Sequence, residues 1–222
     1  MLTYVRVPWH VILTTIIVAV LVAALPQATE AATRRERCLA AAEQALGRDI
    51  QASDYRIVLG TGTGDETLWP SRGRDLICGF GGTEYVRCVI RPGDIFISGA
   101  GGYIVRRQEG GLIVGVNGID IVNYMSGGRF YGRTSGEPGQ DALGDTVDEM
   151  HGGVFHGGPD RDVVGDLHDG RFVGGRGFDI VRFQHGGIYL GQRGNDRVRI
   201  MSGGRFKGGS SADRVVREMS GG

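Results

Sequence analysis

Aspartates recur at a fixed spacing through the second half of the chain and offer a row of carboxylates. The series is Asp145, Asp162, Asp179, Asp196 and Asp213, each 17 residues after the last, and Asp120 lies 25 residues before Asp145. If each interval is one turn of a stacked β-structure, neighbouring carboxylates lie ~4.8 Å apart. At that distance they repel one another by roughly 1 kcal/mol per pair in water. Calcium takes six to eight oxygen ligands, so a calcium ion between turns would convert this repulsion into attraction.

Apolar residues repeat in the same frame and define the elements that must position the aspartates. The full repeat reads Gly-Gly-x-Gly-x-Asp-x-Val-x-x-Met-x-Gly-Gly-x-Phe-x. The three apolar positions hold Val122, Val147, Val164, Val181, Val198 and Val215; Met125, Met150, Leu167, Gln184, Met201 and Met219; and Phe130, Phe155, Phe172, Tyr189 and Phe206. No single repeat buries these side chains alone, so the repeats must stack. We therefore predict an all-β fold, a parallel β-roll or β-helix solenoid of 17-residue turns. Glycine-rich disorder is the alternative, and it would not keep three apolar positions in register.

The frame begins well before the aspartate series. Residues 98–222 follow the 17-residue repeat, with Tyr103 where aspartate would stand and an eight-residue excursion around 133–140 that accounts for the long interval. Residues 56–97 have a shorter spacing. Glu66, Asp75 and Glu84 are nine residues apart, and each is followed two residues later by an apolar side chain. We predict degenerate nonapeptide repeats over residues 56–97.

The stretch from Gly174 to Arg182, Gly-Gly-Arg-Gly-Phe-Asp-Ile-Val-Arg, resembles the nonapeptide of the RTX, or haemolysin-type calcium-binding, repeat family. The resemblance extends over about residues 56–222. It implies calcium between successive turns, held by the motif aspartate and by backbone carbonyls of the glycine turn. The implied carboxylates are Asp162, Asp179, Asp196 and Asp213, with Asp120 and Asp145 as further candidates. The implied carbonyls belong to the turns that contain Gly157, Gly174, Gly175, Gly177, Gly191, Gly194, Gly208 and Gly209. The chain departs from the motif at Gln192, Asp160 and Ser211, where the family has glycine.

Charge and motifs narrow the function further. Lys and Arg total 25 and so do Asp and Glu, which gives no basic excess for nucleic acid. Each polar residue type recurs once per turn rather than clustering, and neither a Gly-x-Ser-x-Gly nor an HExxH motif is present. We expect a calcium-binding structural protein and no enzymatic activity. The alternative is a calcium-independent surface or adhesive solenoid, in which the aspartates bind turn amides and the partners are cell-surface or extracellular polymers.

The N-terminal segment has the features of a secretory signal. Val11 to Leu25 is an apolar run of 15 residues, and Thr29-Glu30-Ala31 offers small residues at the cleavage positions. We predict that residues 1–31 are a signal peptide, that the mature chain is secreted and that it has no membrane span. An uncleaved anchor is the alternative, although the run is shorter than the ~20 residues that span a bilayer.

Residues 32–55 are predicted to cap the solenoid. A helix over residues 33–47 would present Leu39, Ala42, Ala45 and Leu46 on one face and end at Gly47. We expect it to cover the open end of the first turn, because exposed strand edges favour aggregation. The chain has three cysteines, and in an oxidising compartment two of them are expected to form a disulfide. We expect Cys38 to bond with Cys78 or Cys88.

Two further rows of polar side chains follow the repeat. His151, His168 and His185 share one position and could take a transition metal. We expect a solvated row instead, because no carboxylate or cysteine joins them in the repeat. Arg129, Arg171 and Arg205 form the other row. That row could contact anionic polymers, and a solvated face is again the simpler expectation.

Overall fold

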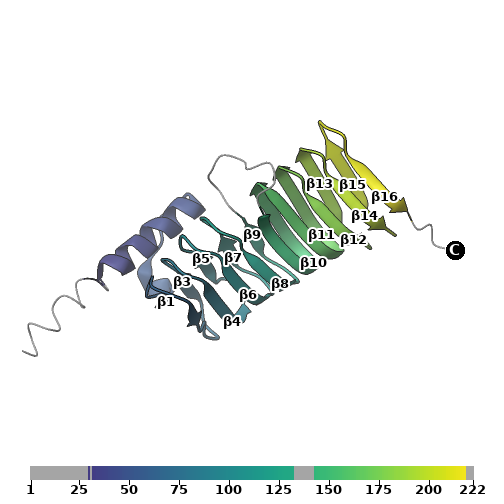
Figure 1. Cartoon of the computed structure of the whole chain (residues 1–222). Helices are drawn as coiled ribbons and strands as arrows, with labels where there is room; N and C mark the ends of the chain where they lie inside the picture. The colour runs from purple at the N-terminus through teal and green to yellow at the C-terminus, as the bar shows by residue number, and fades with distance from the viewer. Residues whose placement is uncertain (1–29, 31, 133–142, 219–222) are drawn as a thin grey trace, which may run out of the picture.

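The predicted period is one turn of a parallel β-solenoid (Figure 1). The structure, a computed structural model, describes residues 30, 32–132 and 143–218. In these ranges 16 strands form one continuous hydrogen-bonded sheet that coils around a narrow core, and every strand pair is parallel. The 17-residue solenoid predicted from the repeat is therefore confirmed.

Each turn contributes a strand to each of two rows. The first row contains β1 (Arg56–Leu59), β3 (Asp75–Cys78), β5 (Ile95–Ile97), β7 (Leu112–Val114), β9 (Arg129–Tyr131), the later parts of β10 (Leu143–Pro159) and β11 (Arg161–Arg176), β13 (Ile188–Arg193) and β15 (Arg205–Gly209). The second row contains β2 (Glu66–Leu68), β4 (Glu84–Ile90), β6 (Tyr103–Gln108), β8 (Ile121–Met125), the earlier parts of β10 and β11, β12 (Ile180–Gln184), β14 (Arg197–Met201) and β16 (Arg214–Glu218). A short 3-10 helix, Ala52–Asp54, precedes β1.

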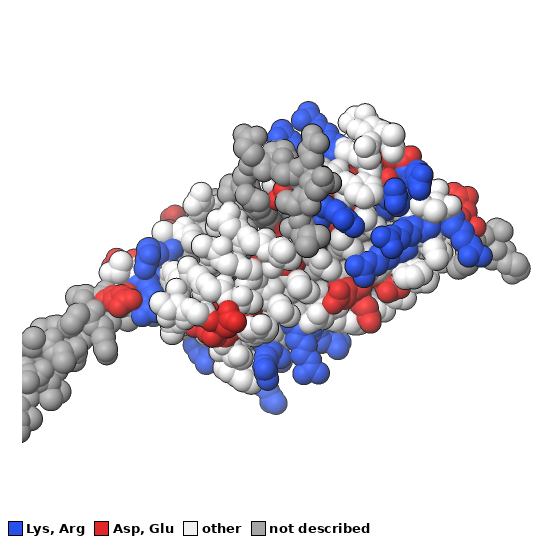
Figure 2. Space-filling model, in the orientation of Figure 1, with Lys and Arg blue, Asp and Glu red and all other residues white. Residues whose placement is uncertain are grey.

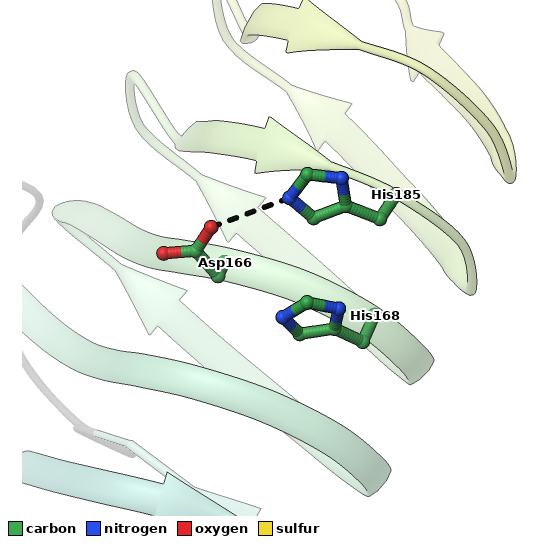
Figure 3. Close-up of side chains that lie close together, drawn as sticks. All are labelled: Asp166, His168 and His185. Atoms are coloured by element: carbon green, nitrogen blue, oxygen red, sulfur yellow. Dashed lines mark hydrogen bonds and ion pairs between the residues drawn. The ribbon is translucent and has the colours of Figure 1, made fainter. Parts of the chain in front are cut away.

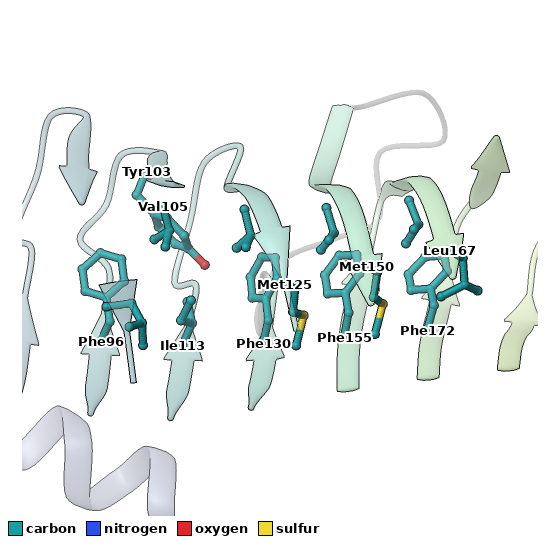
Figure 4. Packing of buried hydrophobic residues seen from close by; sticks show 14 of the residues in the cluster. Phe96, Tyr103, Val105, Ile113, Met125, Phe130, Met150, Phe155, Leu167 and Phe172 are labelled. Atoms are coloured by element: carbon teal, nitrogen blue, oxygen red, sulfur yellow. The ribbon is translucent and has the colours of Figure 1, made fainter. Parts of the chain in front are cut away.

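The core consists of like side chains stacked turn upon turn, as the repeat predicts (Figure 4). The aromatic rings of the first row stack at centroid distances of 4.6–5.0 Å, over the pairs Phe130–Phe155, Phe155–Phe172, Phe172–Tyr189 and Tyr189–Phe206. The valines and methionines of the second row face these rings and are fully buried in the middle turns. Because each side chain covers its neighbour, burial depends on stacking and not on any one turn.

The early turns are longer than the later ones but belong to the same stack. Glu66 pairs with Glu84, and Glu84 pairs with Tyr103, so these turns contain 18 and 19 residues. Asp75 lies halfway round the turn, in the first row. The nine-residue units predicted over residues 56–97 are therefore half-turns that alternate between the two rows. The excursion predicted around 133–140 lies outside the described residues.

The predicted helix is present over residues 32–46, and Gly47 follows it with a φ of +62°. Its predicted position is wrong. The helix packs through Cys38 and Ala42 against the outer faces of β3, β5 and β7 instead of crossing the end of the stack (Figure 1). Those three strands are apolar on both faces, so their outer side also needs cover. Ala45, expected on the buried face, is exposed, because the face of the helix that contacts the strands runs through Cys38, Ala42 and Leu46.

A disulfide joins Cys38 of the helix to Cys78 of β3, and Cys88 is a free, half-buried cysteine. The bond agrees with one of the two pairings that the sequence left open. Over the part of the chain that the structure describes, no helix is both long and apolar enough to cross a bilayer. The predicted signal peptide, residues 1–31, lies outside the described residues except for Glu30.

Candidate functional site

The six repeat aspartates form one continuous column along the second row. Each precedes a valine of the core by two residues, and side chains two apart on a strand point to the same side. The carboxylates therefore point into the solenoid. Asp120, Asp145, Asp162, Asp179 and Asp196 are buried, and Asp213, in the last turn, is half-buried. We refer to these six residues as the aspartate column.

One oxygen of each carboxylate is used to link successive turns. The backbone N–H of Asp162 donates to Asp179 Oδ1 at 2.9 Å, and the N–H of Asp179 donates to Asp196 Oδ1 at 3.1 Å. The same bond joins every neighbouring pair from Tyr103 to Asp213, at 2.7–3.2 Å. This ladder satisfies amides at the starts of the strands and accounts for Oδ1.

The other oxygen is left without a partner along much of the column. Oδ2 of Asp120, Asp162, Asp179 and Asp196 is buried and accepts no hydrogen bond in the described structure. Buried polar atoms are normally paired with protein or water, and exceptions often mark an ion or a catalytic role. These four oxygens indicate that something positive or proton-bearing completes the column.

Electrostatics leads to the same conclusion. Burial, followed by the charges of Asp179 and Asp145, raises the pKa of Asp162 from 3.8 to about 9. Burial and the charge of Asp145 raise the pKa of Asp120 to about 9 as well. Towards the open end the same causes raise the pKa of Asp179 to about 8 and that of Asp196 to about 6. A fully ionised column is thus unfavourable at neutral pH, so protons or a cation must neutralise it.

The predicted site glycines fall into two groups. Gly157, Gly174, Gly191 and Gly208 stand five residues before an aspartate, and a Cβ at any of them would overlap Oδ2 of that aspartate. They leave room for the carboxylates. Gly175, Gly177, Gly194 and Gly209 have positive φ and lie against a backbone carbonyl of the preceding turn. Their role as carbonyl ligands stays a prediction.

Sequence reasoning missed several residues of the column. Gly115 and Gly132 provide the same space beside Asp120 and Asp145. Gly115 could have been found from the sequence, because it stands five residues before Asp120, as the other glycines of this group stand before their aspartates. The hydroxyl groups of Tyr103 and Tyr189 are buried without a hydrogen-bond partner. Burial and the nearby aspartates raise the pKa of both phenols. Their hydroxyls therefore add oxygen atoms to the interior around the column.

A second, shorter aspartate ladder lies in the first row, on the other side of the early turns. The N–H of Asp75 donates to Asp94 Oδ1 at 3.0 Å, and the N–H of Arg91 donates to Asp94 Oδ2 at 2.8 Å. Asp75 accepts from Arg56 Nε at 2.8 Å and from the backbone and hydroxyl of Ser71. Both oxygens of both carboxylates are therefore paired.

In the turns that precede the aspartate column, glutamates occupy the aligned position of the stack. Both carboxylate oxygens of Glu84 are buried without a partner. Burial, followed by the charge of Glu66, raises the pKa of Glu84 to about 7. Glu66 accepts hydrogen bonds from the backbone N–H of Thr61. Unpaired acidic oxygens are therefore also present at Glu84, in the turn before Tyr103.

The two outer rows of polar side chains are both on the surface. Arg129, Arg171 and Arg205 are exposed, but Val154 and Ile188 separate them in the stack. Basic and acidic side chains intermingle on the visible face over the later turns (Figure 2).

The histidines stack ring on ring, and Asp166 lies beside them. The expectation that no carboxylate joins the histidine row is therefore wrong. The histidine row does not predict Asp166, because this residue occupies a different position of the repeat.

No protein-family model matches the chain, and no significant match was found among curated proteins or among solved structures. The resemblance to the RTX repeat stays a prediction from the motif. The structure shows a β-solenoid with buried, partly unpaired carboxylates along one side of its interior.

Proposed function

We propose that the chain is an exported structural solenoid whose aspartate column binds calcium, and that bound calcium stabilises the stack. One observation carries the proposal. Oδ2 of Asp162, Asp179 and Asp196 is buried and unpaired on three successive turns. Ionised carboxylates in such surroundings need a compensating positive charge.

The donor atoms suit a hard cation. Carboxylate oxygens are typical calcium ligands, and the column offers them turn after turn without the nitrogen or sulfur atoms that softer metals prefer. Asp120, Asp145, Asp162, Asp179, Asp196 and Asp213 would hold calcium ions between successive turns, with carbonyls of the glycine turns as predicted additional ligands. Calcium supplies positive charge between carboxylates that otherwise repel one another. A dissociation constant of about 10⁻⁴–10⁻³ M, as in other extracellular modules, would suffice for calcium binding outside the cell.

Export is supported by the disulfide as well as by the predicted signal. The Cys38–Cys78 bond fixes the helix to the sheet, and such bonds persist in oxidising compartments.

Calcium would bind the folded stack and not the unfolded chain, because only stacking brings the carboxylates together. Binding of that kind stabilises the fold by mass action.

A second candidate, a calcium-independent scaffold, is favoured by the hydrogen-bond ladder. Each Oδ1 already accepts an N–H from the preceding turn. Protonation would neutralise the same carboxylates without a metal, since the pKa of Asp162 is raised to about 9. In that case the column would act only as a structural ladder.

Thermal unfolding with calcium and with excess chelator separates the two candidates. Calcium at ten times its Kd should stabilise the fold by about 1.4 kcal/mol per site and raise Tm. The Asp162→Asn/Asp179→Asn/Asp196→Asn variant should lose this response. The matched Asp75→Asn/Asp94→Asn variant should keep it, because those carboxylates are already paired. A calcium-independent Tm in the native chain would contradict calcium binding and favour the scaffold.

A further inference from the structure

Three histidines form a stacked row on the outer surface, next to the second row of strands. The His151 and His168 ring centroids are 4.2 Å apart, and those of His168 and His185 are 4.8 Å apart. His168 belongs to β11 and His185 follows β12, so the last pair bridges two successive turns. These rings point away from the core and are not part of the aspartate column.

A carboxylate from another repeat position lies against the last two rings (Figure 3). Asp166 Oδ1 is 3.4 Å from His185 Nε2. One possible ligand atom from each of Asp166, His168 and His185 lies within 4.8 Å of the other two. The side chains of Asp166 and His185 are 40% and 42% exposed, so an ion and water can reach them.

We propose that Asp166, His168 and His185 bind a divalent transition metal, with Zn²⁺ as the reference ion. Two imidazole nitrogens and one carboxylate oxygen suit zinc, copper or nickel better than calcium. In a tetrahedral site with ligand distances of ~2.0–2.1 Å the ligand atoms are ~3.3 Å apart. Small rotations of these exposed side chains reach that separation, and water completes the coordination.

The orientation of His185 supports this assignment. Its Nδ1 lies 3.1 Å from Ser202 Oγ on the next turn, which leaves Nε2 facing Asp166. A hydrogen bond to the second ring nitrogen commonly orients a metal-binding histidine. Ser202 therefore acts as a positioning residue on the side of the ring away from the proposed ion.

The neighbouring turn offers a similar sequence but a different geometry. Glu149 Oε2 approaches His151 of its own turn at 3.6 Å. Asp166 instead reaches His185 of the following turn, and among the described residues it is the one carboxylate found to link two turns through the histidine row. The site is therefore assigned to one position, and metal bound there would cross-link β11 to the turn after β12.

Calorimetric titration with zinc chloride tests the proposal. The full chain is purified without a histidine tag, and calcium is held constant so that the aspartate column does not change during the titration. We expect one saturable zinc site. His168→Ala and His185→Ala should each weaken binding at least roughly tenfold, and Asp166→Asn should weaken it less. With Cu²⁺ in place of zinc, electron paramagnetic resonance should show two coordinated nitrogens.

Two other histidines provide matched controls. His151 lies in the same row without a bridging carboxylate, and half-buried His156 stacks on Tyr131 in the first row. His151→Ala and His156→Ala should leave the zinc affinity unchanged. Unchanged affinity in the His168→Ala/His185→Ala variant would overturn the proposal, and so would an equal loss in His151→Ala. Because the side chains of Asp166, His168 and His185 reach solvent, the metal-free Tm of their variants should stay constant and exclude misfolding as the cause.

Discussion

The solenoid contains two aspartate ladders that use the same bond between turns but differ in their second oxygen. In the early first row, Asp94 receives N–H groups from both Asp75 and Arg91. In the aspartate column, Asp179 receives one from Asp162, and its Oδ2 is buried without a partner. The backbone bond alone therefore explains a paired aspartate such as Asp94, whereas the unpaired oxygens of the column require a proton or a cation.

The same two regions also differ on their outer surface. In β3, β5 and β7 the residues that point outward are apolar and lie beneath the helix. In β9 the outward residues are the exposed Arg129 and the partly buried Tyr131. The early turns are thus held by a helix and a disulfide, while the later turns depend on stacking and on neutralisation of the column.

The pH dependence of stability should give the largest contrast between the two ladders. The folded-state pKa of Asp120 and Asp162 is raised from 3.8 to about 9, so stability from their protonation is complete below pH ~4 and is lost as pH rises towards 9. In chelator each such aspartate should lower the unfolding free energy by up to about 1.4 kcal/mol per pH unit in that window. Denaturant unfolding at successive pH values measures the slope, and calcium should flatten it. An unfolding free energy that does not change with pH in chelator would contradict protonation of Asp120 and Asp162 in the folded state.

Reduction of the disulfide should affect only the early turns. The bond closes a separation of 40 residues, for which the chain-entropy model gives roughly 4 kcal/mol. Cys38→Ser should therefore increase amide exchange in β1 and β3. Exchange in β12 and β14 should stay near its native rate, which hydrogen exchange with mass spectrometry can resolve. Uniform loss of protection would show that the two regions unfold as one unit.

Glycine substitutions should distinguish the ladders by about 1–3 kcal/mol. A Cβ at Gly174 would overlap Asp179 Oδ2, so Gly174→Ala should lower the unfolding free energy by that amount. At Gly73, near Asp75, the nearest atom to an added Cβ is Ser71 Oγ at 3.6 Å. Gly73→Ala should be close to neutral. Equal effects in denaturant unfolding would argue against a carboxylate packed on Gly174.

The smallest expected effect is on the unfolding free energy of two variants, Asp179→Asn and Asp75→Asn, which should change in opposite directions. Asp179→Asn keeps the acceptor for the Asp162 N–H and removes a charge whose burial is unfavourable. In chelator at pH 8 it should raise the unfolding free energy by roughly 1 kcal/mol, after the cost of an unpaired amide donor. Asp75→Asn weakens the bonds from Arg56 and Ser71 and should lower stability by a similar amount. Stabilisation by Asp75→Asn, measured in the same way, would remove the distinction between the ladders.

Much of the fold follows from the repeat because a parallel, in-register stack places each residue over the one a turn later. The columns of Val164 and Phe172, and the alignment of Asp162 with Asp179, are therefore readable from spacing alone. The position of the helix was also readable, since Ile95-Phe96-Ile97 is apolar at every position whereas Arg129-Phe130-Tyr131 alternates. The 17-residue period alone does not contain this difference between the faces.

The sequence by itself determined the period, the two rows of strands and the alignment of the aspartates. Only the tertiary structure decided that Asp179 Oδ1 is paired while its Oδ2 is not, that Cys38 bonds to Cys78, and that Asp166 reaches His185. The physical reason is the same in each case. Spacing specifies which residues of one column are neighbours, but contacts between different columns depend on side-chain direction and on the path of the chain around each turn.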